Sequence, residues 1–382
     1  MIDIELKPYP GENENAFTKR KAYFIRIVKP RMDYGNMAIE KKLVSAVPLT
    51  SAEREEIDTF WSQYMSPSVR ERLIDYRYYE VFKSTKSDSD KLCYYIPDSF
   101  YYAFIDEFFT NPQHSHPCDD KNLYDLYFHD INRPKTVFRL IHGMLLDEDY
   151  TEITLNEAIN KARDKGEVIL KIASFSEGGR GIMFWNSANN SVNELKDFLS
   201  VSDNIICQEI INQHPVLNEL NQSSINTIRI MTLVYRNKVH IMSSAIRFGA
   251  KGNRTDNISS GGLACGLFSD GRLKPVAYDY EARKHICDSN AKPFEEIIIP
   301  SYGRCVEIVN ALARRFVSLS RLISWDLAID EKGNPLLIEF NLTYGGISFH
   351  QFCNGPILGS LSDDILSDVF SNSYTLNSII KS

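Results

Sequence analysis

The spacing of apolar residues divides the chain into a helical part and a part rich in strands. Thr50 and Glu53 have the spacing of a helix capping box, and apolar residues then recur on one helix face. That helix is expected to end near Ser66 and Pro67. Residues 1–112 are predicted to be mainly helical, and their many tyrosines are expected to pack together, with an aromatic binding surface as the alternative. The residues of the helix face are Ile57, Phe60, Trp61 and Tyr64.

Beyond a linker that ends at Pro117, short apolar runs predict strands between helices. Thr154 and Glu157 form a second capping box, and Gly166 is expected to end the helix that it begins. Little pattern is visible after residue 355, and we interpret this part as a polar tail. Strands are predicted at 168–172, 205–211, 226–235, 239–248, 263–268 and 273–278, and helices at 122–128, 154–164 and 302–319.

Residues 324–341 contain two apolar runs on either side of a short polar turn, which predicts a β-hairpin. The register is counted outward from Asp330, which is expected to face Pro335. Counted in this way, Leu327 lies opposite Ile338.

The same register places two acidic residues, Asp326 and Glu339, directly opposite each other. Asn341 lies two residues beyond Glu339 and points to the same face. Like charges opposite on a strand pair are destabilising, so a cation is expected to neutralise them. Two carboxylates and an amide oxygen are ligands that suit Mg²⁺. The alternative is an edge hairpin whose acidic face is solvated.

A lysine on a strand is followed by a glycine-rich loop. Lys171 interrupts an otherwise apolar strand, and the loop after it contains Gly178, Gly179 and Gly181. Glycines allow backbone N–H groups to converge on an anion, so the combination indicates a phosphate-binding site. A lysine that reaches the solvent and a simple hairpin turn are the alternatives. The loop is not a Walker A motif.

Further polar residues occupy strand positions. Arg229 and Arg247 stand at positions of the buried type, where each needs an anionic partner. Carboxylates within the fold are the simplest partners. Gln208 and Glu209 form a polar pair at the end of another apolar strand.

Composition narrows the class of protein. With 382 residues, 43% of them hydrophobic, the chain is long enough for two or three domains. The net charge of −7, with no stripe of Lys or Arg, argues against a nucleic-acid partner. No membrane span or signal peptide is visible in the sequence. The seven cysteines are scattered and form no C-x-x-C pair, so we expect them to be free thiols and the protein to be cytoplasmic.

The order of these features resembles the ATP-grasp superfamily between about residues 115 and 355. Within it, the chain looks most like the branch called sugar-transfer-associated ATP-grasp proteins. Many family members follow the metal-binding Asn with Pro-Gly, whereas L-T-Y-G-G follows Asn341 here. The segments that carry the resemblance are I-N-T-I-R at 225–229, D-N at 256–257 with G-G at 261–262, and I-E-F-N at 338–341.

The resemblance implies an α+β ATP-grasp fold, in which two lobes grip ATP, preceded by a helical N-terminal region. Lys121 and Lys171 would contact the ATP phosphates. A mobile lid loop would cover the nucleotide, and a hinge strand would line the adenine pocket. The implied lid residues are Gly178, Gly179, Arg180 and Gly181, and the implied adenine-pocket residues are Gln208, Glu209 and Ile211.

The resemblance also implies the reacting end of the site. Asp326, Glu339 and Asn341 would hold one or two Mg²⁺ ions. The transferred phosphate, or an acyl phosphate, would be contacted by Arg247, Asn257 and Arg229.

The implied activity is an ATP-dependent carboxylate–amine ligase that forms an amide through an acyl phosphate in surface-polysaccharide biosynthesis. Its substrates would be a small carboxylate and an amine, such as a uronic-acid sugar and an amino acid. A peptide-modifying ligase and a non-catalytic nucleotide-binding partner of a glycosyltransferase are the alternatives. The expected parts are a helical region at 1–112, a first lobe at 113–207, a second lobe at 208–355 and a tail at 356–382.

Overall fold

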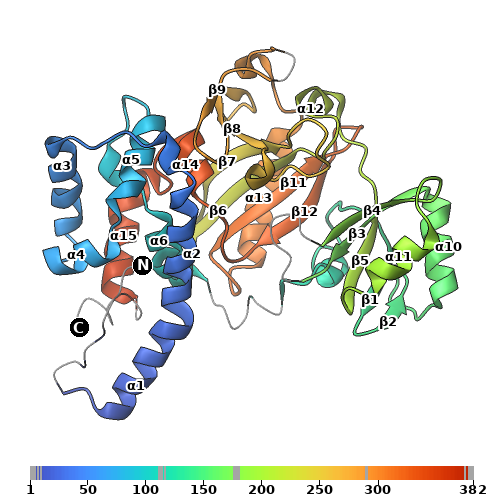
Figure 1. Ribbon diagram of the computed structural model, residues 1–382, viewed down its shortest axis with the longest axis horizontal. Coiled ribbons are helices and arrows are strands. Elements are labelled where there is room, and N and C mark those ends of the chain that lie inside the picture. The colour runs from blue at the N-terminus through green and yellow to red at the C-terminus, as the bar shows by residue number, and fades with distance from the viewer. Residues whose placement is uncertain are drawn as a thin grey trace.

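The fold is known from a computed structural model, in which helices, a large sheet and a small sheet follow one another along the long axis (Figure 1). This arrangement confirms the α+β class and the mainly helical N-terminal region. No helix among the described residues is long and apolar enough to cross a membrane. The described residues are 6, 8, 11–110, 115, 118–174, 181–288, 291–373 and 376.

The N-terminal helices form one layer at the end of the molecule. The capping box at Thr50 and Glu53 is present, and the helix that it begins buries Trp61. Five tyrosines of this region are buried and pack in the core, as predicted, whereas Tyr34 is exposed; the buried ones are Tyr78, Tyr79, Tyr95, Tyr101 and Tyr102. The helices are α1 (Glu14–Tyr23), α2 (Lys29–Glu40), α3 (Ser51–Ser62), α4 (Pro67–Leu73), α5 (Tyr76–Thr85), α6 (Asp98–Phe100) and α7 (Asp106–Phe109), with π-helical turns η1 (Phe24–Val28) and η4 (Tyr101–Ile105).

The smaller sheet lies at the opposite end of the molecule. Among the described residues it has five strands in the order β2-β1-β5-β3-β4. The capping box at Thr154 and Glu157 begins α10, and Gly166 ends it with a φ of 75°. The elements of this lobe are η6 (Lys121–Leu123), α9 (Tyr124–Tyr127), β1 (Thr136–Ile141), β2 (Met144–Leu146), α10 (Leu155–Lys165), β3 (Glu167–Ile172), β4 (Ile182–Asn186), α11 (Val192–Leu199) and β5 (Asn204–Glu209).

The larger sheet occupies the middle of the molecule. Within the described ranges it has seven strands in the order β10-β9-β8-β7-β6-β11-β12, and the neighbouring strands pair antiparallel. The elements of this lobe are α12 (Pro215–Leu220), β6 (Thr227–Tyr235), β7 (Lys238–Phe248), β8 (Leu263–Leu267), β9 (Leu273–Tyr278), β10 (Lys284–His285), α13 (Tyr302–Arg315), β11 (Leu322–Ile329), β12 (Pro335–Asn341), α14 (Ser348–Asn354) and α15 (Ser362–Asn372).

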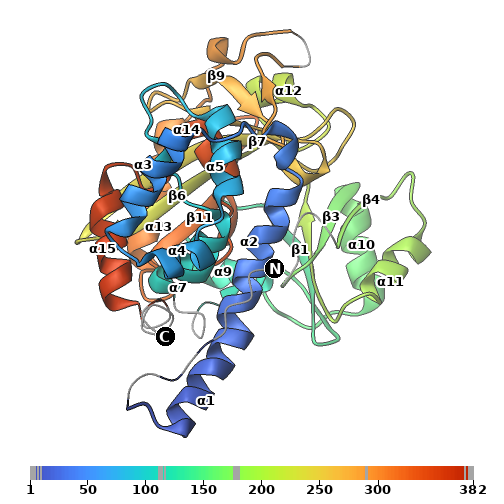
Figure 2. The same cartoon turned by 60° about the vertical axis from the view of Figure 1, so that its left-hand side comes forward.

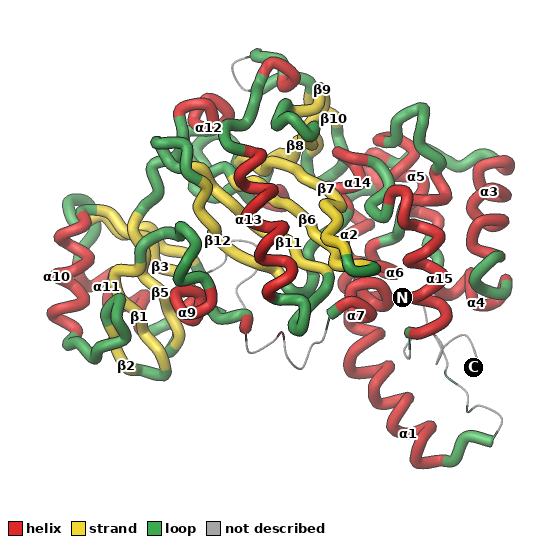
Figure 3. The backbone as a smooth tube through the Cα atoms, turned by 180° about the vertical axis from the view of Figure 1, so that it is seen from behind, coloured by secondary structure: helices red, strands yellow, loops and turns green. Residues whose placement is uncertain are grey.

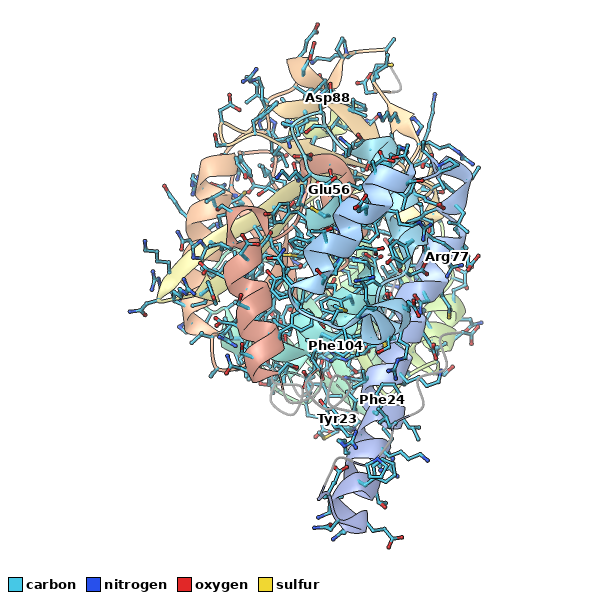
Figure 4. All side chains as sticks on the ribbon, turned by 90° about the vertical axis from the view of Figure 1, so that its left-hand side faces the viewer. Tyr23, Phe24, Glu56, Arg77, Asp88 and Phe104 are labelled. Atoms are coloured by element: carbon cyan, nitrogen blue, oxygen red, sulfur yellow. The ribbon has the colours of Figure 1, made fainter. Side chains whose placement is uncertain are left out.

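Helices cover both faces of this larger sheet. On one face α13 packs across the central strands, and its Val309 and Leu312 share a core with Ile230 of β6 (Figure 3). On the other face α14 and the N-terminal helices share a core with Leu233 of β6 (Figure 2). Figure 4 looks onto this helical layer, in which Phe104 is buried. The N-terminal region is therefore docked on the second lobe through a common core.

The hairpin predicted at 324–341 is formed by β11 and β12. Asp326 lies opposite Glu339, as predicted. A β-bulge directly after Asp326 then shifts the register, and Leu327 faces Leu337. The predicted partner of Leu327, Ile338, is therefore wrong.

The cause of the shift lies in the turn. The carboxylate of Asp330 accepts hydrogen bonds from the backbone N–H groups of Lys332 and Asn334, so Asp330 belongs to the turn. Pro335 consequently faces Ile329, and the predicted pairing of Asp330 with Pro335 is wrong. The bulge compensates for this difference of one residue, which is why the two carboxylates still meet.

The prediction of an unpatterned tail after residue 355 is also wrong. Helix α15 buries one face against the N-terminal helices, and Phe370 stacks on Tyr64 and Phe100 with ring centroids 5.0 and 5.9 Å apart. The signal was present in the sequence, since the apolar residues have helical spacing. They are Ile365, Leu366, Val369 and Phe370.

Replacing Leu366 by alanine tests whether α15 belongs to the core. Leu366 is fully buried, so its truncation is expected to lower the free energy of unfolding by about 2–5 kcal/mol. Urea unfolding followed by circular dichroism measures this change. Asn372→Ala, at the exposed end of the same helix, is the control and is expected to stay within about 0.5 kcal/mol. If the two variants are equally stable, α15 does not contribute to the core.

Candidate active-site cleft

A large cleft opens between the two sheets and the N-terminal helices. Its volume is about 1330 Å³, and residues of all three parts of the chain line it. Single small-molecule pockets usually measure about 300–1,000 Å³, so this cleft has room for a nucleotide and a second ligand.

The paired carboxylates lie on the floor of the cleft. Glu339 forms an ion pair with Lys121, with 2.8 Å between Oε1 and Nζ. Asp326 is buried and accepts two hydrogen bonds from Arg229, of 2.6 and 2.5 Å. Arg229 is its cross-strand neighbour on β6. The protein's own cations therefore neutralise both carboxylates.

A second arginine completes this arrangement. Arg247 donates to Asp326 at 3.1 Å and to the hydroxyl of Thr227 at 2.8 Å, and lies 3.3 Å from Asp256. Asp256 in turn accepts a hydrogen bond from Thr227. Both strand arginines thus pair with carboxylates within the fold, as the simpler interpretation of the sequence expects. Asn257, next to Asp256, also lines the cleft.

These contacts control the charge of the floor. Burial disfavours a charged Asp326, but Arg229 and Arg247 outweigh burial and hold the pKa of this carboxyl below its usual range. Burial also opposes a charged Lys121, yet the Glu339 carboxylate raises its pKa. Burial and the two arginines lower the pKa of His350, which lies below the floor, to about 3. His350 is therefore neutral at pH 7.

Lys171 points into the cleft and not to the bulk solvent. Its Nζ donates to Oε1 of Gln208 on the neighbouring strand at 3.2 Å. Burial, together with the like charge of Lys121, lowers its pKa to about 8. A lysine held in this state gains its full charge when an anion binds beside it. Lys171 is half-buried and lines the cleft.

The segment between the lobes forms another wall. Of the three implied adenine-pocket residues, Glu209 and Ile211 line the cleft, whereas Gln208 is buried beside Lys171. Glu209 also pairs with Lys165 at 2.6 Å.

Gly181 has a φ of 72°, and a Cβ there would lie 2.5 Å from the side chain of Ile172. This glycine is therefore required by close packing.

The other predicted lid residues lie outside the described residues. They are Gly178, Gly179 and Arg180.

The donor set of the predicted metal site fits Mg²⁺ chemically. The amide nitrogen of Asn341 donates to the Ser324 carbonyl at 3.2 Å, which leaves the amide oxygen for a cation. Oδ1 of Asp326 keeps a second lone pair beside its bond to Arg229, whereas Oδ2 accepts from both Arg229 and Arg247. Within the described ranges, no group of three or more His, Cys, Asp or Glu side chains could hold a metal. Phosphate and water oxygens would therefore have to complete the shell, as is usual for Mg²⁺.

The structure thus gathers most of the predicted residues in one place. The floor joins residues from four strands of the larger sheet, one strand of the smaller sheet and one short helix, and the hinge adds Glu209 and Ile211. Sequence reasoning missed Thr227 and His350 as parts of this network, although Thr227 stands inside the I-N-T-I-R segment. For His350 the sequence offers no signal, because it lies on α14, beyond the hairpin.

Comparison with known proteins identifies a family. Residues 105–365, about two thirds of the chain, match a family model described as sugar-transfer associated ATP-grasp. This match confirms the resemblance seen in the sequence. No curated protein matches the chain.

Solved structures with a similar fold have low sequence identity. D-alanyl-alanine synthetase A from Vibrio cholerae is 13% identical, with a TM-score of 0.43 over 70% of this chain and 68% of that one. The biotin carboxylase domain of 2-oxoglutarate carboxylase from Hydrogenobacter thermophilus is 14% identical, with a TM-score of 0.41 over 69% and 48%. D-alanine–D-alanine ligase from Bacillus anthracis is 15% identical, with a TM-score of 0.36 over 71% and 69%.

Proposed function

The chain belongs to the sugar-transfer-associated ATP-grasp family, and on this premise we propose that it is an ATP-dependent carboxylate–amine ligase. The reaction forms an amide through an acyl phosphate, and the carboxylate and amine are small molecules such as a uronic-acid sugar and an amino acid. The enzyme acts in surface-polysaccharide biosynthesis, in the cytoplasm.

The observation that carries this proposal is the charge of the cleft floor. Four cationic side chains are gathered there among carboxylates, and Asp119, which also lines the cleft, acts on Lys121 as well. A floor of this kind favours a polyanion, because each added phosphate charge meets a cation that is already in place. The cations are Lys121, Lys171, Arg229 and Arg247, and the carboxylates are Asp256, Asp326 and Glu339.

Each group has a role in the proposed reaction. Asp326, Glu339 and Asn341 would hold Mg²⁺, which would supply charge neutralisation at the triphosphate. Lys121 and Lys171 bind the phosphates, which lets an acceptor carboxylate approach the γ-phosphorus in line. No sequence motif places a Ser, His or Cys as a nucleophile of the enzyme, and among the described residues His350 is buried below the floor. The phosphoryl group therefore passes directly to the substrate.

The acyl phosphate is then attacked by the amine, and phosphate leaves. Arg247 stabilises the charge on the phosphate during both steps, and Arg229 fixes Asp326 beside it. Asn257 lies on the same wall and contacts the transferred group. The hinge residues Glu209 and Ile211 face the adenine, and the lid excludes water from the intermediate.

A screen for ADP release tests this function. Purified protein with MgATP is incubated with pairs of amino acids and uronic acids. We expect little ADP without substrates and a clear increase with one carboxylate–amine pair. If ADP release is the same with and without every pair, the protein is an ATPase or a nucleotide-binding protein and not a ligase.

Lys171→Met is expected to weaken ATP binding by about tenfold at pH 7, since a charge-assisted phosphate contact is lost. In the wild type, affinity should fall as the pH rises through about 8, because the free protein loses the Lys171 proton there and the complex retains it. Calorimetry across this pH range measures both effects.

Two further results decide this prediction. The pH dependence should disappear in Lys171→Met, while Lys196→Met, an exposed lysine on α11, should retain wild-type behaviour. Unchanged affinity and pH dependence in Lys171→Met would show that Lys171 does not bind phosphate.

A further inference from the structure

The N-terminal helices form a wall of the active-site cleft. Tyr34 and Ala38 of α2 and Lys42 just beyond it are spaced four residues apart, and all three line the cleft. Asp98, at the start of α6, lines it beside them. This wall lies outside the two lobes that grip the nucleotide, so a different ligand has to explain its polar side chains.

Lys42 and Asp98 form a buried polar pair with unused bonding capacity. They are 4% and 2% exposed, and Nζ lies 3.8 Å from Oδ2. Oδ2 of Asp98 accepts from Ser348 at 2.5 Å, whereas Oδ1 has no partner among the described residues. Lys42 donates to the Ala38 carbonyl at 3.0 Å, which uses one of its three N–H groups. A buried acceptor without a partner is costly and indicates a missing ligand.

Aromatic rings surround this pair. The ring of Tyr34 meets those of Tyr102 and Tyr344 edge-on, with centroids 5.3 Å apart in each case. The Lys42 ammonium lies 5.0 Å from the centroid of the Tyr280 ring. The four tyrosines line the same part of the cleft.

This part of the cleft adjoins the reacting end of the floor. Tyr344 follows Asn341 of the proposed metal site by three residues, and its backbone N–H donates to Asp106 of α7 at 3.4 Å. Arg31 of α2 lies over the Tyr344 ring at 5.1 Å. The same wall contains L-T-Y-G-G, the segment that departs from the family pattern.

We propose that Tyr34, Lys42, Asp98 and the neighbouring tyrosines bind the sugar ring of the second substrate. An adjacent donor and acceptor match two neighbouring hydroxyl groups, and aromatic faces pack against the C–H groups of a pyranose. An ammonium ligand fits less well, because Lys42 already places a cation beside Asp98. The inference rests on the proposed function, which supplies the reaction. It adds that the N-terminal helical region selects the acceptor substrate.

Direct binding of monosaccharides tests this site separately from catalysis. Glucuronic acid, methyl glucoside and methylammonium are titrated into the full chain with Mg²⁺ and a non-hydrolysable ATP analogue, and ligand contacts are followed by saturation-transfer NMR. We expect a pyranose to bind with millimolar or better affinity. Asp98→Asn and Tyr34→Ala should each weaken that binding by about tenfold. The affinity for the ATP analogue should stay unchanged in both variants.

Controls separate folding from binding. Tyr34 is 41% exposed, so its truncation is expected to leave thermal unfolding close to that of the wild type. Phe268→Ala, an aromatic residue 40% exposed outside the cleft lining, should leave sugar binding unchanged. The proposal is overturned if no pyranose binds, if only methylammonium binds, or if both variants bind the pyranose like the wild type. Failure of the ATP analogue to bind, with sugar binding intact, would contradict the proposed ligase and not this site.

Discussion

Asp326→Asn is expected to lower the free energy of unfolding by about 3–5 kcal/mol, although it changes only one atom. Asp326 is buried and accepts hydrogen bonds from both Arg229 and Arg247. Asparagine keeps the shape but removes the negative charge, so two buried guanidinium groups lose their common counter-ion. Chemical denaturation at pH 7 measures this loss.

The effect should have a defined pH dependence. The arginines hold the pKa of Asp326 below its usual range, so its stabilising contribution is present above the ordinary carboxyl pKa and is lost only as the pH falls through the lower, folded value. Asp270→Asn, which breaks the surface pair with Arg272, is the matched control and should cost far less stability. Equal losses in the two variants would mean that Asp326 does not neutralise the arginines.

Glu339→Gln is expected to reduce MgATP-dependent turnover by about a hundredfold or more while the fold is retained. Glutamine keeps one oxygen but lacks the charge that a divalent cation requires. Two opposed carboxylates alone would predict a gain in stability on removal of one. The ion pair between Glu339 and Lys121 cancels that expectation, since the lysine would be left without its partner.

Turnover of Glu339→Gln is measured as ADP release at saturating Mg²⁺, with circular dichroism to verify the fold. Glu307→Gln, an exposed residue of α13 on the opposite face of the sheet, is the control and should retain wild-type activity. Near-normal, Mg²⁺-dependent turnover in Glu339→Gln would place the metal site elsewhere.

Local patterns in the sequence predicted much of the fold. The capping boxes at Thr50 and Thr154 mark two helices correctly, because capping depends on residues only three positions apart. The hairpin was also predicted, but Asp326 and Glu339 face each other as predicted only because a bulge offsets the misplaced turn register. The bulge after Asp326 was not predicted, because it depends on how the Asp330 carboxylate bonds within the turn.

Contacts between distant segments could not be read from the chain. Arg229 and Asp326 are neighbours because β6 pairs with β11, across almost one hundred residues, and no local pattern specifies that pairing. The contact of Lys42 with Asp98 likewise depends on how the helices pack. The sequence therefore predicts the residue types of the site, while the tertiary fold decides which carboxylate neutralises which cation.

Trapping with hydroxylamine tests the central claim most directly. Hydroxylamine intercepts acyl phosphates, so enzyme, MgATP and the carboxylate that stimulates ADP release should together yield a hydroxamate, and Arg247→Ala should reduce its yield. The account predicts hydroxamate in proportion to ADP. If that carboxylate compound never gives a hydroxamate and a product phosphorylated on a hydroxyl group accumulates instead, the protein is a kinase and the ligase account is wrong.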